Sequence, residues 1–553
     1  MLCQECKFVF EEPLVLVQKP RQLDRWSANC SYGITLSQLE LKATFCYICR
    51  GIIRQLVASR TSTRLQIQAD TVLQIKYALS IQTDPRGCVR LWNQAFLDGQ
   101  GLGPQVVHFD KVSIEEPPLT STNTNSAETL EFVKRCLNAC RDQHKACVAL
   151  TPSWSPTRLV QVEQNSLRLV ESTVSEPYAS LSHCWGNAQI LKLTVENMAS
   201  LKREIPIARL PQTFRDAIQV VKSLGIKYIW IDSLCIIQNS NDDWQREART
   251  MLKVYQHAQC NIAASHSANS FGGLFRNRNP GLLGSVLDID NGKLKGRFHL
   301  VDQGYFGQEV DDAPLNRRSW VAQERLLSPR IIHFAPEQVI WDCAELTACE
   351  SLPHDPKVWC KYGAPGRKFG CKQNSEFTTT PKTVQGSLGR WARIVNTYSA
   401  CGLTVLGDKL MAIFGVAENL RNELGLEYCA GLWQHKMEIQ LAWFVLEHQT
   451  NRSPRNDLAP SWSWLSINGA VDMQQIDLYL GYDIKPLVSI TEVDLRRETG
   501  DARCEKIVGF LRMRCSLNPV TVKEARETSK SQAKAWSMQR EHALFERQVG
   551  YRV

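Results

Sequence analysis

Between Tyr178 and Pro280 the chain alternates short apolar runs with amphipathic segments, which predicts strands alternating with helices. The apolar runs cover residues 178–182, 228–231 and 260–264. The second run, YIWI, is apolar at every position, as expected of a strand that is covered on both faces. Strands separated by helices of this length predict a parallel sheet with right-handed crossovers, and therefore an α/β fold.

The two segments between these strands have the pattern of amphipathic helices. Pro211 can open the first helix and Gly225 can end it, and the apolar positions between them fall on one face. Asn241 or Asp242 can cap the second helix. Both segments are therefore expected to cover the sheet.

The flanking sequence predicts elements of both kinds. The polar segment over residues 115–129 has the composition of a linker, and the last ~30 residues are polar and helix-prone. Predicted strands cover residues 65–82, 167–172, 296–302, 330–334 and 338–343, the last two as a hairpin, and predicted helices cover residues 130–147, 319–327, 387–399, 410–420 and 431–448.

Length and composition indicate a globular protein of several structural units. The chain has 553 residues, 43% of them apolar and 22% charged. Its longest apolar runs are far shorter than the ~20 residues of a membrane span, and no secretory signal is visible at the N-terminus. We therefore expect a protein without a membrane span, in the cytoplasm or nucleus. The net charge of +9 is dispersed, so no nucleic-acid partner is expected.

The carboxyl ends of the predicted strands carry the main polar candidates, because ligands of doubly wound sheets bind there. Asp232 directly follows YIWI, although it can also cap the next turn. Trp185 can form the aromatic floor of a binding site, where Gly186 would let a ligand approach the backbone closely. The alternative is that Gly186 forms a turn and Trp185 packs in the core. His183 and His266 lack a partner at metal spacing. The strand-end residues are Ser182, His183, Trp185 and Gly186, then Asp232 and Ser233, then Ser265 and His266.

The twenty cysteines are expected to be reduced thiols, and some have the spacing of zinc ligands. Two C-x-x-C pairs can complete one closed, structural tetrahedral zinc site. Buried, unligated thiols are the alternative. The pairs are Cys3 with Cys6 and Cys46 with Cys49, and a C-x3-H-x2-C run follows at Cys140, His144 and Cys147.

Several sequence blocks, in this order, resemble the HET (heterokaryon incompatibility) domain of filamentous fungi. They are LSHCWG, LPQTFRDAI, YIWIDSLCIIQ, DDWQREARTM, VYQHAQCNIAAS and RRSWVAQERLLSPRIIHF, the last followed by WDC. The resemblance covers residues 177–343 and extends to later segments such as APSWSWLSINGAV. It implies a role in non-self recognition and programmed cell death. It also implies activation by a protein or allelic partner, with oligomerisation on activation, and a shared structural role for the cysteine motifs.

The resemblance also points to Glu324 in RRSWVAQERLLS. HET domains are distantly similar to TIR domains, in which a helix carries a catalytic glutamate. By this analogy Glu324 would stabilise an oxocarbenium ion on the ribose of a nicotinamide dinucleotide (NAD), as glycosidase carboxylates do, and Asp232 or Ser182 would orient the nucleotide. Glu324 can instead pair with a nearby arginine, Arg317, Arg318 or Arg325.

Glu247 is a further ligand-binding candidate that the resemblance suggests. Its charge also suits the N-terminal part of a helix, which is the structural alternative. The sequence has no glycine-rich phosphate loop, so ordinary dinucleotide or nucleoside triphosphate binding is not indicated.

Together these observations predict a TIR-like or flavodoxin-like parallel α/β core flanked by α+β regions. The favoured function is a signalling and interaction module of heterokaryon incompatibility. The alternatives are a TIR-like NAD-consuming hydrolase using Glu324 and an accessory protein or enzyme of secondary metabolism. The expected divisions are an N-terminal cysteine-containing region (1–115), a linker and C-x3-H-x2-C helix (116–176), the HET domain (177–343), a C-terminal α+β region (344–520) and a polar tail (521–553).

Overall fold

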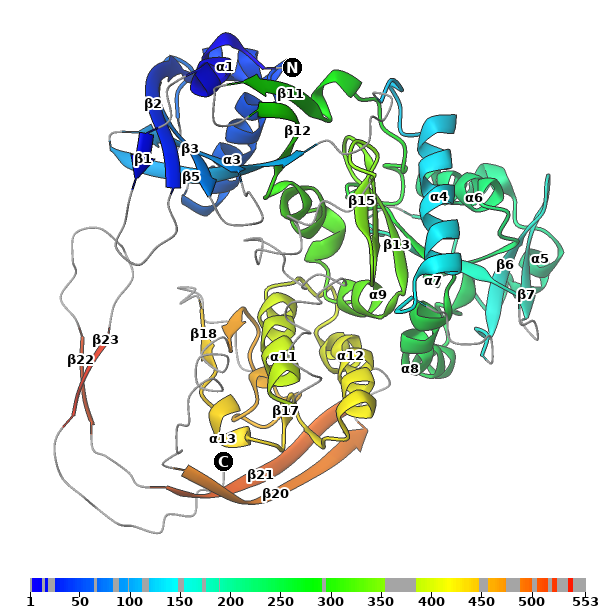
Figure 1. Cartoon of the computed structure of the whole chain (residues 1–553). Coiled ribbons are helices and arrows are strands. Elements are labelled where there is room, and N and C mark those ends of the chain that lie inside the picture. The colour runs from blue at the N-terminus through cyan, green and yellow to red at the C-terminus, as the bar shows by residue number, and fades with distance from the viewer. Residues whose placement is uncertain are drawn as a thin grey trace.

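The computed structural model arranges most of the chain in three regions, coloured blue with two green strands, cyan to green, and yellow to orange in Figure 1. Within the described part of the chain, no helix combines the length and apolarity that a bilayer crossing requires. The structure describes residues 2–11, 15–17, 25–63, 67–82, 89–97, 99–111, 119–147, 154–171, 176–187, 189–290, 295–353, 384–446, 456–473, 488–499, 505–515, 520–524 and 536–540.

The first region is an antiparallel sheet in the order β1-β2-β3-β4-β5-β12-β11, packed against three helices. Leu73, Ile75 and Tyr77 alternate on its buried face. The strand predicted over residues 65–82 is confirmed from Val72 onward, because a turn precedes it. The elements are α1 (Gln4–Glu11), β1 (Val15–Val17), β2 (Arg25–Thr35), α2 (Leu36–Ala43), α3 (Tyr47–Thr63), β3 (Val72–Gln82), β4 (Val89–Leu97), β5 (Gln100–Lys111), β11 (Ser285–Asp290) and β12 (Lys295–Asp302).

Strands β11 and β12 come from the middle of the chain but complete this N-terminal sheet. β12 pairs antiparallel with β5, with Leu300 opposite Phe109. The sequence predicts a strand near residues 296–302 without indicating its partner. The segment of the chain that follows β10 therefore returns to the first region and adds two strands to its sheet.

The second region is an eight-stranded mixed sheet in the order β15-β14-β13-β10-β8-β9-β6-β7. β8, β9, β10 and β13 run parallel, and the predicted hairpin is formed by β13 and β14. Antiparallel strands at both edges make the sheet mixed rather than purely parallel. The strands are β6 (Arg158–Val162), β7 (Leu167–Glu171), β8 (Tyr178–Ser182), β9 (Tyr228–Trp230), β10 (Cys260–Ala263), β13 (Arg330–Phe334), β14 (Val339–Cys343) and β15 (Thr347–Cys349).

Helices surround this mixed sheet, and their ends follow local hydrogen bonds. Ser126 caps α4 by accepting from Thr129 N, so the helix begins before the predicted residue 130. The cap of α8 is Ser240 rather than the predicted Asn241 or Asp242. The helices are α4 (Ala127–Gln143), α5 (Met198–Arg203), α6 (Gln212–Ser223), α7 (Asp232–Cys235), α8 (Asn241–His257) and α9 (Val321–Leu327).

The third region packs two helices around a core rich in tryptophan, including Trp391, Trp433 and Trp464. Both helices, α11 and α12, are predicted by the sequence. The elements are α11 (Val384–Ser399), α12 (Lys409–Leu424), β16 (Tyr428–Cys429), β17 (Leu432–Trp433), α13 (Met437–Gln440), β18 (Phe444–Val445), β19 (Val471–Asp472), β20 (Val488–Thr499) and β21 (Glu505–Cys515). Strands β22 (Val520–Glu524) and β23 (Trp536–Arg540) form a separate two-stranded sheet, which Figure 1 draws apart from this region.

The long helix predicted over residues 431–448 is wrong. Of its described residues, 431–446, only α13 is helical, because Gly431 and Lys436 have positive φ angles of 95° and 53° that interrupt a right-handed helix. The Gln440 side chain then bonds the backbone N–H and C=O of Trp433. The prediction of helix in the C-terminal tail is also wrong for the described residues, because β22 pairs there with β23. The remaining residues of the tail, 525–535 and 541–553, lie outside the described residues.

Candidate functional site

Three predicted polar residues, Ser182, Asp232 and Glu324, converge at the carboxyl ends of the central strands. Ser182 ends β8, Asp232 follows β9 and Glu324 lies on α9. Figure 1 places α9 at this end of the sheet, and α9 packs against α8 and α12. Its anchor on the strands is an apolar cluster made by Cys184, Ala263, Leu315, Val321 and Ile331.

Glu324 is a buried carboxyl group with an incomplete set of partners. Glu324 is 6% exposed, and its Oε2 atom has no hydrogen-bond partner among the described residues. Burial raises its pKa from 4.5 to about 7; the Arg318 charge and a hydrogen bond with Ser182 oppose the rise, while the Asp232 charge adds to it. At neutral pH the protonated and ionised forms of Glu324 are therefore both populated.

Ser182 links Glu324 to the strands. Its hydroxyl lies 3.1 Å from Asn261 Oδ1 and accepts from Asn261 Nδ2 at 2.9 Å. Burial raises the pKa of both Glu324 and Tyr255, and the nearby Ser182 hydroxyl opposes this rise in each case. Ser182 is 2% exposed. The interior of the site is thus a closed polar network.

Asp232 forms the more open side of the site, with 26% of its side chain exposed. Trp185 Nε1 donates to Asp232 Oδ2 at 2.7 Å, and Ser233 N donates to Oδ1 at 2.7 Å. The second bond stabilises the turn that begins α7. Asp232 therefore caps this turn, as the structural alternative predicts, and also lies at the site. Ser233 itself is buried, and its hydroxyl has no partner among the described residues.

His183 is buried behind Trp185 and lies near Asp232. The two rings stack with centroids 6.4 Å apart, and His183 Nδ1 is 3.9 Å from Asp232 Oδ1. Burial lowers the pKa of His183 to about 4, despite the Asp232 charge. The imidazole is therefore neutral at physiological pH, which fits a packing role rather than acid–base work.

Gly186 has a positive φ of 66°, and a Cβ there would lie 2.5 Å from the Asn269 Cβ. Gly225 also has a positive φ, of 70°, but a Cβ there would meet open space. We expect Gly186→Ala to lower the free energy of unfolding by about 2–3 kcal/mol and Gly225→Ala by about 1 kcal/mol. Hydrogen exchange of the β8 amides measures the loss of stability in each variant. Equal losses in Gly186→Ala and Gly225→Ala would contradict the clash at Gly186.

The remaining predicted residues lie in other surroundings. Glu247 is buried beside Arg158, with 3.5 Å between Oε1 and Nη2, in a cluster that includes Asp243. Ser265 is within 3.2 Å of His333 Nδ1, and His266 is exposed. The ligand role of Glu247 stays a prediction.

The nearby arginines do not form an ion pair with Glu324. Arg325 pairs with Asp311, Arg317 donates to Asp312 O, and Arg318 donates to His183 O. Among the described residues Glu324 has no ion pair within 4.0 Å, so the predicted structural alternative is not the one adopted. Sequence reasoning missed Asn261 and Tyr255, although a polar residue in the apolar run CNIAA is a usable signal for the first.

The structure also contains two clusters of cysteine and histidine that could bind a metal. In the first cluster the Sγ atoms of Cys3 and Cys6 lie 3.7 and 3.6 Å from Cys49 Sγ. Hydrogen bonds from the other three thiols lower the pKa of Cys46. In each cluster the ligand atoms all lie within 4.8 Å of one another; the clusters are Cys3, Cys6, Cys46 and Cys49, and Cys140, His144, Cys147 and Cys343.

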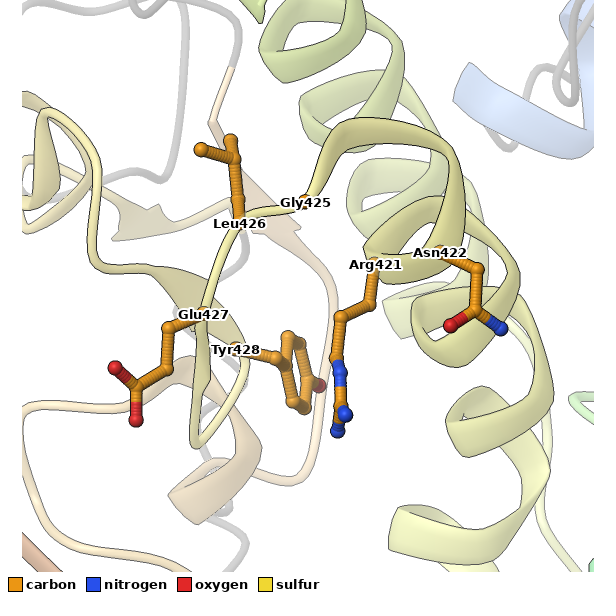
Figure 2. Close-up of a pocket in the computed structure, with 6 residues that line it drawn as sticks. All are labelled: Arg421, Asn422, Gly425, Leu426, Glu427 and Tyr428. Carbon is orange, nitrogen blue, oxygen red and sulfur yellow. The ribbon is translucent and has the colours of Figure 1, made fainter.

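A surface hollow lies apart from these sites, at the end of α12. Its lining side chains are exposed or half-buried. Figure 2 shows that they come from the helix end and the turn after it. Among its lining side chains only the Tyr428 hydroxyl is a buried polar atom without a partner, and a single such group defines no ligand, so we assign the hollow no role. It is lined by Arg421, Asn422, Gly425, Leu426, Glu427 and Tyr428.

Comparison with known proteins identifies the region that builds the site. The family model described as Heterokaryon incompatibility protein (HET) matches residues 178–324, a range that starts at β8 and ends on Glu324. No curated protein and no solved structure matches the chain. The match shows that residues 178–324 form a HET domain, the domain described for heterokaryon incompatibility proteins.

Proposed function

We propose that this protein acts in the cytoplasm in non-self recognition and the associated programmed cell death, as a signalling module that a protein partner engages. The HET domain over residues 178–324 carries the proposal. The part of that domain through which it acts is the group of Ser182 and Glu324, which are buried, and Asp232, which is half-buried. A largely closed site of this kind suits a protein that a partner switches on.

The order of the parallel strands supports a flavodoxin-like, TIR-like core. The four strands lie side by side as β13-β10-β8-β9, so the first strand in the chain lies between the second and the third. In open α/β sheets ligands bind where the strand order reverses. Here that point lies between β8 and β10, where Ser182 meets Asn261.

Induced expression in a filamentous fungus tests the proposed function. We expect the full chain to reduce viability and Glu324→Gln to abolish this effect at equal protein level. Glu204→Gln is the matched control, because Glu204 is an exposed carboxylate outside the site. Harmless accumulation of the folded wild-type chain contradicts the proposal.

A second candidate function, hydrolysis of NAD, is favoured by the unpartnered Oε2 and raised pKa of Glu324. The ionised carboxylate stabilises the oxocarbenium ion as nicotinamide departs with the bonding electron pair. Water then adds to the ribose carbon and releases a proton, which gives ADP-ribose. Release of nicotinamide by the purified full chain, and its loss in Glu324→Gln, separates this activity from signalling alone. Unchanged NAD together with undiminished killing by Glu324→Gln rules it out.

This mechanism predicts a specific pH dependence. Because the ionised form of Glu324 is required and its pKa is about 7, the rate of NAD loss should rise about tenfold from pH 6 to pH 8. Initial rates over this range measure the rise. A rate that is flat or falls with pH contradicts a carboxylate role for Glu324.

The first cysteine cluster is proposed to hold a structural zinc ion. The Sγ separations of 3.6 and 3.7 Å match the about 3.8 Å edge of a tetrahedron with zinc–sulfur bonds of about 2.3 Å. The ligands come from α1, α3 and the residues just before each helix, so bound zinc would tie α1 to α3. We expect Cys46→Ser to lose about one zinc ion per chain, measured by elemental analysis of the full-length protein. A metal-free, well-folded wild-type protein rules this site out.

A further inference from the structure

The cluster of Cys140, His144, Cys147 and Cys343 joins residues from separate parts of the fold. Cys140 lies near the end of α4, His144 and Cys147 follow that helix, and Cys343 ends β14. His144 and Cys343 are 199 residues apart in the chain, yet His144 Nδ1 lies 3.4 Å from Cys343 Sγ. Three thiols and one imidazole are a frequent donor set of structural zinc sites.

Arg330 supplies the charge that such a site requires. It is 3% exposed, and its Nε donates to Cys140 Sγ at 3.0 Å. Its other acceptors are Gln259 O and Cys147 O, at 3.3 and 2.6 Å. Among the described residues Arg330 has no carboxylate partner, and a buried cation without an anion is costly. Zinc with three thiolates and a neutral histidine carries one negative charge, which balances this guanidinium.

Backbone donors complete the surroundings of the sulfur atoms. Leu346 N donates to Cys343 Sγ at 3.2 Å. Cys140 and Cys343 lower the pKa of Cys147, and the backbone N–H groups of Glu345 and Ala344 add to this lowering. Hydrogen bonds of this kind orient and stabilise the thiolates of metal sites. Buried neutral thiols would leave the donor to Cys343 with a weak acceptor and would leave the Arg330 guanidinium without a balancing negative charge.

We propose that Cys140, His144, Cys147 and Cys343 bind a second structural zinc ion, which fastens α4 to β14. Residues of α4, including Phe132, Val133 and Leu137, belong to the hydrophobic core of the central sheet. The family match over residues 178–324 contains none of the four ligands. The zinc ion thus connects the helix that precedes the HET match to a strand that follows it.

Elemental analysis of the full-length protein and three variants tests this site. We expect about two zinc ions per wild-type chain and about one in Cys343→Ser. Cys136→Ser should keep both, because Cys136 is a buried thiol one turn earlier on α4 and outside the cluster. Arg330→Met should lose zinc to a competing chelator about 10–100-fold more readily than wild type.

Differential alkylation of the wild-type chain gives a readout that does not depend on a variant folding. Mass spectrometry should find Cys140, Cys147 and Cys343 protected before a chelator is added and modified afterwards. Two results overturn the proposal: equal zinc content in Cys343→Ser and wild type, or an alkylation pattern that the chelator does not change. A disulfide between two of these cysteines, detected without reductant, also overturns it.

Discussion

Glu324→Gln should stabilise the HET domain at pH 8 by about 3 kcal/mol relative to wild type. Burial raises the pKa of Glu324 from 4.5 to about 7. A carboxyl group whose pKa is higher in the folded state stabilises the fold below about pH 4.5, and this contribution is lost as the pH rises through about 7. The amide of Gln cannot ionise, so the variant should not show this loss between pH 4.5 and 8.

Hydrogen exchange of the β8 and β10 amides in the full chain measures this effect, because it reports the stability of these strands separately from the other regions. Glu204→Gln is the control and should follow the wild-type pH dependence, since Glu204 is exposed. A Glu324→Gln variant that loses stability with pH as steeply as wild type would show that Glu324 is not the buried group responsible.

Arg278→Met should lower the free energy of unfolding by about 3–5 kcal/mol. The Arg278 and Glu350 side chains are 0% and 1% exposed, and their nitrogen and oxygen atoms are 2.5 and 2.9 Å apart. Arg278 also donates to Ser121 O at 2.9 Å, so it fixes the segment before α4 to the central sheet. Removing the guanidinium leaves the Glu350 carboxylate buried without its charge partner.

The double variant Arg278→Met, Glu350→Gln should recover part of this loss, because no unpaired charge then remains buried. Arg209→Met is the control, since Arg209 is exposed. Thermal unfolding of the full chain, supported by hydrogen exchange of β15, measures the three variants. A loss below about 1 kcal/mol for Arg278→Met would contradict the importance of this ion pair.

The central strands could be predicted from the sequence because their apolar runs are continuous and bounded by turn and helix signals. YIWI became β9 and the run at residues 260–264 became β10, each with one residue fewer than predicted. The failed helix at residues 431–448 also contains a continuous apolar run, LAWFVL. There the positive φ angles at Gly431 and Lys436 and the tertiary bonds of Gln440 determine the structure, and a local pattern does not contain them.

Part of the candidate site could be predicted in the same way. Ser182 and Asp232 follow from the position of ligands at strand ends, whereas Glu324 required the family resemblance, since α9 is distant in sequence from both. The partners of Glu324 are tertiary and were not predictable from spacing. Cys343 could not be predicted as a member of its cluster for the same reason, because it lies 199 residues from His144 in the sequence. Tertiary contacts between residues that are distant in the sequence leave no pattern in the local sequence.

Viability after induced expression of wild type and Glu324→Gln in a filamentous fungus is the most direct test that the buried carboxyl site produces cell death. Because Glu324→Gln is expected to fold at least as well as wild type, loss of killing could not be attributed to misfolding. We predict that wild type and Glu204→Gln kill, and that Glu324→Gln accumulates to the same level without killing. Equal killing by wild type and Glu324→Gln would contradict the central role of this site.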